Sequence, residues 1–422
     1  MTALILPILE DAVRGGVAAF RTYIKLQPAG GVGSKIFPPT YSGGVYAMET
    51  RRVNGENVSA VLLDSVQSQA NRLEEVLRDA WEGGELRVPT IFADFGQVEF
   101  DGASDQVLNS VREIGRLTTF DAPHRIADAI FRDSTTEDGT PFRDAFARAF
   151  EANMRNATAL FELCPAALVF GTWDSTGSRG GMGNKFARAL VSEIVGIHAA
   201  PGVRTSSRID PLAISSKVPI FARKGGGWTA LAAEAQRDEK GEVVRYESKA
   251  GKGHPSAVNH SNVTPDIVKG EKSGEPISGG VTVDYALQTV VLSMPALRRL
   301  RFPVNGEQSP DRNHAARTVL AALALVAIVR QFEDGAFLRS RCDLVPESDK
   351  LTIERVRSAN VSDDDQFTLT SEGAIALLDQ AVGKAEAQGL PWQTEPIRLT
   401  PTPDLVGLVV ESRRFEFQEE QL

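Results

Sequence analysis

The chain has 422 residues, with 46 basic and 55 acidic side chains, a formal net charge of −9, 42% hydrophobic and 24% charged residues. This balance is ordinary for a soluble globular protein of one to three domains, and it argues against a uniformly basic nucleic-acid binder. The charge is uneven, because residues 343–422 hold 16 Asp or Glu and 7 Lys or Arg, and the first 342 residues are neutral. A local basic surface on the N-terminal part is therefore compatible with the composition.

Cysteine usage and apolar segments predict a cytoplasmic protein. Cys164 and Cys342 are too few for a disulfide framework, and both flank apolar runs, so buried reduced thiols are expected. The apolar start, Leu4–Leu9, is short and contains Pro7, which does not fit a signal peptide. The longest apolar helix, Thr318–Val329, is too short to span a bilayer and is expected in the core.

The first predicted element is a strand. Residues 17–27 (VAAFRTYIKLQ) alternate in the manner of a half-buried strand, with Arg21 and Lys25 spaced to share one face. That face either lines a groove for RNA or is simply an exposed sheet surface. A Gly- and Pro-rich loop containing Lys35 follows, and a short strand is expected at Asn57–Leu63.

A helix is predicted from Ser65 to about Trp81. Its buried face carries Val66, Ala70, Leu73, Leu77 and Ala80. Gln67, Gln69 and Asn71 lie near the positive end of this helix, where polar side chains can meet an anion. The alternative is a capping box, since Gln67 comes three residues after the possible N-cap Asp64.

Residues 82–160 are predicted to form a mixed insertion with a helical end. One helix is expected to have Asp121 as its N-cap and to carry Ile126, Ala129 and Ile130. The next is expected to have Thr140 as its N-cap and Pro141 in its first position, before Phe142, Phe146, Ala149 and Phe150.

The most informative block is residues 168–211. The apolar run Ala166–Phe170 predicts a buried strand that ends at Gly171 in a loop rich in Gly, Ser and Thr. A helix is expected next, with Phe186, Leu190, Ile194 and Ile197 on one face. Such a loop favours phosphate, because it presents backbone N–H groups and a helix N-terminus.

The charge around this loop agrees with an anionic ligand. From Gly177 to Thr229 the sequence has only Glu193 and Asp210 as acidic residues, so its net charge is +6. The eight basic residues are Arg179, Lys185, Arg188, Arg204, Arg208, Lys217, Arg223 and Lys224. A Gly-rich surface loop without a ligand is the open alternative.

Nucleotide-binding motifs are incomplete. A Walker A loop ends in Gly-Lys-Ser/Thr, whereas this loop ends in Gly183-Asn184-Lys185-Phe186. A dinucleotide-binding fingerprint requires an acidic residue at the end of the following strand, but Ser206, Ser207 and Arg208 are found there. The phosphates of a polymer are therefore favoured over those of a nucleotide cofactor, and no cofactor is expected.

The C-terminal half begins with a polar segment. Residues 235–280 are rich in Gly, Pro and Lys and are expected to form a long loop or hairpin outside the core. The elements predicted after it are a strand at Val281–Leu292, a core helix at about Asp311–Phe332, a strand at Cys342–Val345, a helix at Ser371–Gln388 and a strand at Asp404–Val410.

The element order indicates an α+β fold. Strand, helix and strand are expected at 166–172, 184–197 and 203–209, and again at 281–292, 311–332 and 342–345. Two interrupted βαβ-like units suit an RRM-like (ferredoxin-like) sheet. A doubly wound parallel sheet is the second interpretation.

Several blocks of the sequence resemble a known family. They are GGVGSKIFPPTY (30–41), VLLDSVQSQANRLEE (61–75), LVFGTWDSTGSRGGMGNKFARALVSEIVG (168–196), TSSRIDP (205–211) and DYALQTVVLSMPALRRLRFP (284–303). They resemble the GSU-type backbone subunit of the type I-U (now I-G) CRISPR interference complex, a member of the RAMP superfamily. The resemblance covers roughly residues 15–335.

The resemblance implies an RRM-like palm, a helical insertion and a protruding thumb hairpin, for which the candidates are residues 1–81 with 161–345, residues 82–160 and residues 235–280. The acidic part, 346–422, contributes little to the resemblance and is expected to pack on the palm. The resemblance also implies several copies of the chain lined along one crRNA, other Cascade subunits as partners and no membrane. Each copy would grip the RNA backbone, the thumb would displace a base at regular intervals, and target DNA would be read through the guide. The aromatic RNP pattern of base-stacking RRM domains is absent, and Phe20 and Tyr23 alone decorate the first strand. Backbone contacts are therefore expected to dominate.

The residues expected to contact RNA are basic and polar positions, some within these blocks and some outside them. They are Arg21, Lys25, Lys35, Gln67, Gln69, Asn71, Ser175, Thr176, Arg179, Lys185, Arg188, Ser206, Arg208, Arg223 and Lys224. Arg298, Arg299 and Arg301 are expected to contact either RNA or the next subunit.

No catalytic residue and no metal site are expected. His254 and His260 lie six residues apart without the further ligands that zinc needs. Asp174 is expected to start an Asx-turn, although related type III subunits cleave RNA with a loop aspartate. Two rival functions stay open, namely a ribonuclease of the same superfamily and a nucleotide-dependent enzyme that uses the 171–185 loop.

Overall fold

The computed structural model describes residues 2–174, 176, 185–249, 251–269 and 278–419. The chain divides into two compact units. Unit 1 comprises Met1–Ser34, Ala47–His198 and Val283–Leu422, and unit 2 comprises Lys35–Tyr46 and Ala199–Thr282.

Unit 1 is built on one large sheet with the order β1-β23-β22-β2-β19-β10-β4-β3, and β21 joins it by pairing with both β2 and β20. Its strands are β1 (Thr2–Ala3), β2 (Ala19–Pro28), β3 (Met48–Val53), β4 (Glu56–Asp64), β10 (Leu190–Ile197), β19 (Tyr285–Ser293), β20 (Ala336–Arg339), β21 (Cys342–Pro346), β22 (Ile353–Val356) and β23 (Gln366–Thr368). All neighbours are antiparallel except β1 and β23. The predicted α+β class is confirmed, and the doubly wound parallel alternative is wrong.

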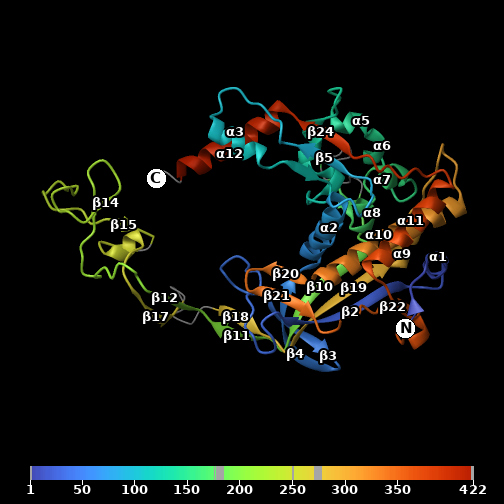
Figure 1. Ribbon diagram of the computed structural model, residues 1–422, viewed down its shortest axis with the longest axis horizontal. Coiled ribbons are helices and arrows are strands. Elements are labelled where there is room, and N and C mark those ends of the chain that lie inside the picture. Colours follow the sequence, from blue (N-terminus) through green and yellow to red (C-terminus); the bar gives the residue numbers. More distant parts are fainter. Residues whose placement is uncertain (1, 175, 177–184, 250, 270–277, 420–422) are drawn as a thin grey trace. The chain divides into compact units, whose positions relative to one another are not determined.

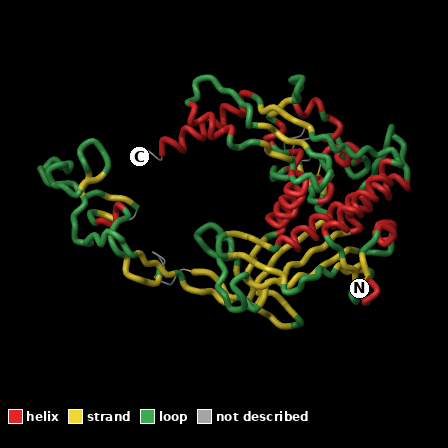
Figure 2. The backbone as a smooth tube through the Cα atoms, in the orientation of Figure 1, coloured by secondary structure: helices red, strands yellow, loops and turns green. Residues whose placement is uncertain are grey.

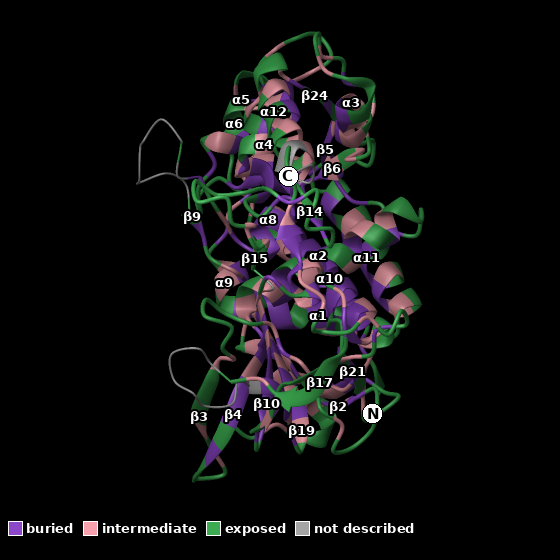
Figure 3. Ribbon diagram, turned by 90° about the vertical axis from the view of Figure 1, so that its left-hand side faces the viewer, coloured by how far each residue is buried: buried purple, intermediate pink, exposed green. Residues whose placement is uncertain are grey.

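Helices cover one side of this sheet (Figures 1 and 2). They are α1 (Leu6–Arg14), α2 (Val66–Glu82), α9 (Met294–Arg298), α10 (Pro310–Asp334) and α11 (Ser371–Glu386). The predicted core helix is confirmed, because almost every side chain of α10 from Ala315 to Val329 is buried. Figure 3 shows the buried residues concentrated in α2, α8 and α10. Among the described helices α10 alone is long and apolar enough to cross a membrane, but 83% of that stretch is buried inside the protein.

A buried polar network joins α2 to the sheet. Gln69 is 0% exposed, and its amide donates to Asp64 Oδ2 at 2.6 Å. Its carbonyl oxygen accepts from Ser192 Oγ at 2.6 Å and from Gln288 Nε2 at 2.9 Å. The expectation that Gln69 contacts RNA is therefore corrected, because its side-chain amide already forms hydrogen bonds with Asp64, Ser192 and Gln288 inside the core.

The start of α2 is set by Ser65, whose hydroxyl accepts from the Ser68 N–H at 3.3 Å. The capping box proposed for Asp64 and Gln67 is therefore wrong, since Asp64 lies before the cap and bonds to Gln69 and Arg72. Gln67 is left to project from the first turn of the helix.

The segment between α2 and β10 mixes short helices with strands. Its elements are β5 (Ile91–Asp94), α3 (Asp105–Arg112), β6 (Arg116–Thr118), η1 (Arg125–Ala127), α4 (Ala129–Arg132), β7 (Ser134–Thr135), α5 (Phe142–Ala145), α6 (Ala147–Phe150), α7 (Thr158–Leu163), α8 (Ala166–Val169), β8 (Thr172–Trp173) and β9 (Lys185–Phe186). The helix expected at Asp121 begins later, with Asp128 as the cap of α4. The helix expected after Thr140 is two short helices, because the chain leaves helical geometry at Phe146.

The C-terminal part adds a strand to this segment. β24 (Ile397–Pro401) completes a four-stranded sheet of order β6-β5-β24-β7. α12 (Pro403–Glu419) then packs against α3, as Figure 1 shows at the upper edge of the view. The strand predicted at Asp404–Val410 is wrong, because these residues belong to α12 and the strand precedes them.

The expected strand–helix–strand order of the 166–209 block is also wrong. Residues 166–169 are the buried helix α8, and residues 190–197 are the strand β10 between β4 and β19. The spacing of the residues around Leu190, Ser192 and Ile194 fits a strand as well as a helix. The segment is a strand because it forms backbone hydrogen bonds with β4 on one edge and β19 on the other. The anion-binding argument from a helix N-terminus therefore falls, and any anion site here must rest on side chains.

Unit 2 is a succession of short antiparallel strand pairs. Its elements are β11 (Ala200–Val203), β12 (Thr205–Arg208), β13 (Phe221–Ala222), β14 (Trp228–Thr229), β15 (Glu247–Ser248), β16 (Gly251–Lys252), η3 (Pro255–Val258), β17 (Val263–Ile267) and β18 (Ser278–Thr282). β11 pairs with β18 and β12 with β17, so the chain goes out and returns along the same two pairs. The predicted thumb segment, 235–280, lies within this unit.

Candidate nucleic-acid interface

A cavity of about 410 Å³ in unit 1 gathers four of the residues predicted to bind RNA. These are Gln67 and Asn71 from α2, one turn apart, and Lys185 and Arg188 from β9 and the residues that follow it. The remaining lining residues are Pro123, His124, Arg125, Phe170, Gly171, Thr172, Trp173, Phe186 and Ala187.

The cavity wall depends on a tight approach of two backbones. β8 pairs with β9 so that Thr172 faces Phe186 and Trp173 faces Lys185. Gly171 has φ +83°, and a Cβ there would lie 2.9 Å from the Phe186 carbonyl oxygen. Only glycine meets both demands, so Gly171 fixes the geometry of the pair.

Arg188 is a partly buried cation without a carboxylate partner among the described residues. Its Nε is buried and has no hydrogen-bond partner in the described part of the chain. Burial, and then the neighbouring Arg125, lower the pKa of Arg188 from its ordinary value. Because an unpaired charge is costly away from water, a bound anion would stabilise this guanidinium.

Below the cavity lies a buried ion pair. Arg125 Nε donates to Glu74 Oε1 at 2.6 Å, and a second bond joins Arg125 Nη2 to Glu74 Oε2. Arg125 also donates to the Gly171 carbonyl at 2.8 Å. Burial raises the pKa of Glu74 to about 7, against the opposing attraction of Arg125. The pair anchors α2 to the residues that form the cavity wall.

Trp173 and Lys185 form the exposed part of the site. The Trp173 side chain is 47% exposed, and Lys185 Nζ lies 5.8 Å from the centroid of its ring. An exposed indole beside an ammonium group and an unpaired guanidinium offers both stacking and phosphate contacts. Trp173, Arg125 and His124 are not among the residues predicted from the sequence to contact RNA.

Asp174 is held in place beside the cavity. Its Oδ1 accepts from the Thr176 N–H at 3.0 Å and from Arg143 Nη2 at 2.9 Å. Burial works to raise its pKa, but the bonds from Arg143 and Thr176 lower it below the ordinary value. The predicted Asx-turn is confirmed, and the Thr176 hydroxyl is engaged with Arg143 in the same cluster. Ser175 and Arg179 lie outside the described residues.

Arg21 and Lys25 share the uncovered face of β2, as predicted. Arg21 forms an ion pair with Glu354 at 2.7 Å, which offsets its charge. Lys25 is exposed, and its Nζ lies 4.9 Å from the centroid of the Tyr285 ring on β19. Lys25 is therefore the better placed of the two to meet an anion.

The remaining predicted residues belong to unit 2. Lys35 Nζ donates to the Val203 carbonyl at 3.4 Å, and Arg208 donates to the carbonyls of Ser261 and Asn259. Arg223 pairs with Glu234 at 3.0 Å, whereas Ser206 and Lys224 are exposed. The +6 segment at 177–229 is thus divided between the two units.

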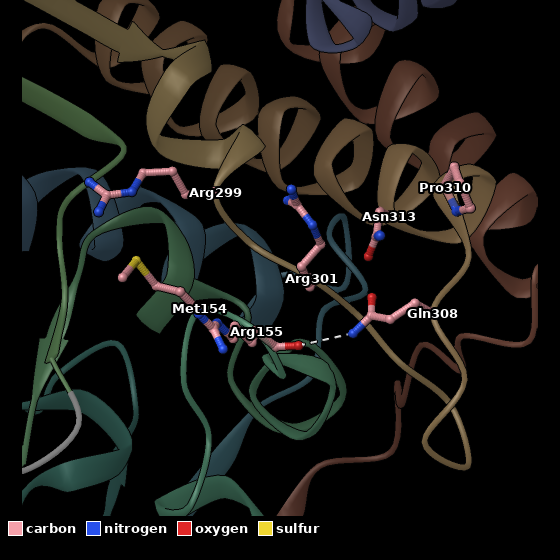
Figure 4. Close-up of a pocket in the computed structure, with 7 residues that line it drawn as sticks. All are labelled: Met154, Arg155, Arg299, Arg301, Gln308, Pro310 and Asn313. Atoms are coloured by element: carbon pink, nitrogen blue, oxygen red, sulfur yellow. Dashed lines mark hydrogen bonds between the residues drawn. The ribbon is translucent and has the colours of Figure 1, made fainter.

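A second basic region surrounds a cavity of about 690 Å³ lined by Met154, Arg155, Arg299, Arg301, Gln308, Pro310 and Asn313. Figure 4 shows Gln308 reaching the Arg155 backbone, where its amide donates to the carbonyl at 3.2 Å, while Arg301 points away toward the helices. Arg301 donates to the carbonyls of Arg298 and Leu300, and Arg298 donates to Val17. Arg298 and Arg301 therefore hold backbone, and Arg299 is the exposed member of the three.

Groups suited to metal binding are absent from the described residues, which contain no cluster of three or more His, Cys, Asp or Glu side chains. Cys164 and Cys342 are free and buried, as predicted, and burial raises their pKa values to about 11 and about 12. Neither thiol is therefore a ready nucleophile.

Comparison with known proteins finds one family that part of the chain resembles. Residues 20–201 match the family model described as CRISPR-associated protein GSU0053. No curated protein matches the chain. The matched range contains β2 except for Ala19, all of α2 and every residue that lines the 410 Å³ cavity. In these residues, which are less than half of the chain, the protein is similar to a CRISPR-associated family of the GSU0053 type.

Proposed function

We propose that this chain is a CRISPR-associated protein of the GSU0053 type, a crRNA-binding backbone subunit that polymerises along the guide RNA of a Cascade complex. The observation that carries the proposal is the half-buried Arg188, which lies beside Lys185 and Trp173 and has no ion-pair partner among the residues that the structure describes. Such a site suits a phosphodiester strand whose bases are available for stacking. In this role the protein binds RNA without cleaving it, and the guide pairs with target DNA.

The sheet of unit 1 supports an RRM-like palm. The strands β22, β2, β19 and β10 lie side by side and antiparallel, in the order 4-1-3-2 when counted along the chain. α2 and α10 lie on one face of this sheet, as in a ferredoxin-like fold. The β3–β4 hairpin extends the sheet beyond β10.

Unit 2 supports the proposed thumb. Its outgoing and returning strands pair with each other, and its surface is mostly exposed and polar between residues 204 and 268. A hairpin with so little apolar burial suits contacts with RNA or with a neighbouring copy of the chain. A cytoplasmic location follows from this role, since the guide RNA is made there.

The rival ribonuclease function draws no support from Asp174. Asp174 is 6% exposed, and its carboxylate already accepts hydrogen bonds from Arg143 and Thr176. A catalytic aspartate must instead be free to accept a proton or to bind a metal in reach of the RNA.

The direct test uses the purified full-length chain and a labelled RNA that carries the CRISPR repeat. We expect a shifted complex on a native gel and intact RNA on a denaturing gel, with and without magnesium. Asp174→Asn should change neither result. RNA cleavage that this substitution abolishes would establish the ribonuclease function instead, and no binding at any salt concentration would contradict both.

A further inference from the structure

A third cavity, of about 650 Å³, opens on the uncovered face of the large sheet. It lies where β2 changes its partner. β22 pairs with Ala19–Arg21, and β21 pairs with Leu26–Pro28, so the connecting loop 347–352 borders the residues between them. Two bonds hold this loop, from the Glu347 N–H to the Lys25 carbonyl at 2.9 Å and from Thr22 Oγ1 to the Thr352 carbonyl at 2.7 Å.

Aromatic and apolar side chains line the cavity. Tyr23 projects from β2 and is 51% exposed. Tyr285 and Leu287 come from β19, where Leu287 is the cross-strand partner of Lys25. Both pack against the buried side chains of the same sheet, so they are held in position. Leu351 from the loop is 4% exposed and adds an apolar surface.

Cations accompany both tyrosines. Lys25 Nζ lies 4.9 Å from the centroid of the Tyr285 ring, and the Arg21 guanidinium carbon lies 4.8 Å from that of Tyr23. Lys350 is exposed on the loop. The one carboxylate at the cavity, Glu347, accepts from Gln27 Nε2 at 2.7 Å. The charge of Arg21 is offset by its ion pair with Glu354. The positive charge at the rim therefore comes from Lys25 and Lys350.

These observations fit one chemical class, a planar base joined to a phosphate. An apolar cavity with aromatic walls accepts the face of a base, and lysines at the rim meet its phosphate. We propose that this cavity receives a nucleobase of the bound RNA strand, stacked on Tyr23 or Tyr285. The inference rests on the proposed function, and it adds base contact to a protein whose sequence predicted backbone contacts alone.

The absence of an RNP pattern in the sequence does not conflict with this proposal. Tyr23 and Tyr285 lie 262 positions apart in the chain, and the pairing of β2 with β19 brings them to one cavity. A linear motif search cannot detect such a pair, because its spacing is set by everything folded between the two strands.

The test compares two strands of equal length, an oligoadenylate and a base-free ribose-phosphate chain. The full-length protein should bind the oligoadenylate more tightly at the same salt concentration. Tyr23→Leu should lower affinity for oligoadenylate by about fivefold or more, since each stacked base contributes on that scale. It should leave the base-free strand unaffected, and Tyr23→Phe should restore binding. Tyr285→Leu and Tyr285→Phe should behave alike.

Phe337→Leu is the matched control, because Phe337 is a 62% exposed aromatic side chain elsewhere in the same unit. It should change neither affinity. If Tyr285→Leu fails to fold, the half-exposed Tyr23 still carries the test. Equal affinity for the two strands, or an equal loss on both in Tyr23→Leu, would overturn the inference while leaving the proposed function intact. Failure to bind either strand would instead contradict the proposed function.

Discussion

Trp173 and Lys185 are cross-strand partners in the β8–β9 pair, with Lys185 Nζ 5.8 Å from the centroid of the Trp173 ring. The pair stands at the mouth of the cavity that Arg188 and the start of α2 also line. Trp173, Lys185 and Arg188 thus line one cavity, although Trp173 lies before residues 177–184 in the sequence and the two cations lie after them. This convergence is the basis for the proposed RNA interface.

The first prediction concerns the two cations of this cavity. Lys185→Gln combined with Arg188→Gln should weaken crRNA binding and flatten its salt dependence. Each lost contact with single-stranded phosphate should reduce the slope of log affinity against log salt by about 0.7, so the double variant should lose about 1.4. Binding isotherms at several salt concentrations measure this slope.

The matched control for that experiment is Arg132→Gln. Arg132 is an exposed arginine of the same unit whose charge is paired with Asp133 at 2.7 Å. Its replacement should leave the slope unchanged. An unchanged slope in the double variant, together with a lower melting temperature, would assign Lys185 and Arg188 a structural role.

The second prediction concerns the buried pair under the cavity. Arg125→Met should destabilise the protein by about 3–5 kcal/mol at pH 8, because it leaves the Glu74 carboxylate buried without its partner. Adding Glu74→Met should recover much of the loss, since no buried charge then remains. Denaturant unfolding measures both values, and a single variant as stable as the parent would show that the pair contributes little.

The third prediction follows from the pKa of Glu74. Burial raises this pKa from 4.5 to about 7 in the folded protein. Between these two pH values the carboxyl group is mostly protonated in the folded state and mostly ionised in the unfolded state. The stability from this proton is fully present below pH 4.5 and is lost as the pH rises through about 7. The stability of the parent relative to Glu74→Gln should therefore fall across this window and level off above it. A constant difference would contradict the assignment.

The fourth prediction concerns unit 2. Arg208 and Val263 are cross-strand partners, so a short Gly/Ser linker in place of Ile209–Asn262 can close the β12–β17 pair as a hairpin. Because the excised residues lie wholly within unit 2, the melting of unit 1 should be unchanged. Removal of Asp238–Gly279 is a poorer design, since it deletes β17, the partner of β12, and the first two residues of β18, the partner of β11.

The excised variant should still bind RNA but lose regularly spaced protection of the guide from nuclease. The reason is that the proposed thumb sets the spacing between copies of the chain. Undiminished regular protection would show that another part of the chain sets the spacing.

The sequence pattern correctly predicted those elements in which buried residues recur at the period of a strand or of a helix. The alternation in 17–27 predicted β2 and the shared face of Arg21 and Lys25, and the spacing of Leu73 and Leu77 predicted α2. Residues 190–197 fit both periods, and only their pairing with β4 and β19 decides for a strand. No local pattern could show that decision.

The cationic residues of the candidate site could be predicted from the sequence. The aromatic residues and the buried ion pair beside them could not. Lys185 and Arg188 stand out in sequence because they follow a Gly-rich loop. The role of Arg125 depends on Glu74, 51 residues away, and Tyr285 reaches Tyr23 only through the β2–β19 pairing. Gln69 shows the opposite error, since its place on α2 suggested exposure and the sheet buries it.

The central claim is that this chain holds guide RNA, and the RNA that accompanies it gives the most direct measurement. The full-length protein would be purified from cells that express it with its CRISPR array, and the bound RNA would be sequenced and sized. The account predicts RNA of one uniform length with repeat-derived ends, intact after incubation with the protein. No bound RNA, or a mixture of cellular RNAs without enrichment of the guide, would contradict it.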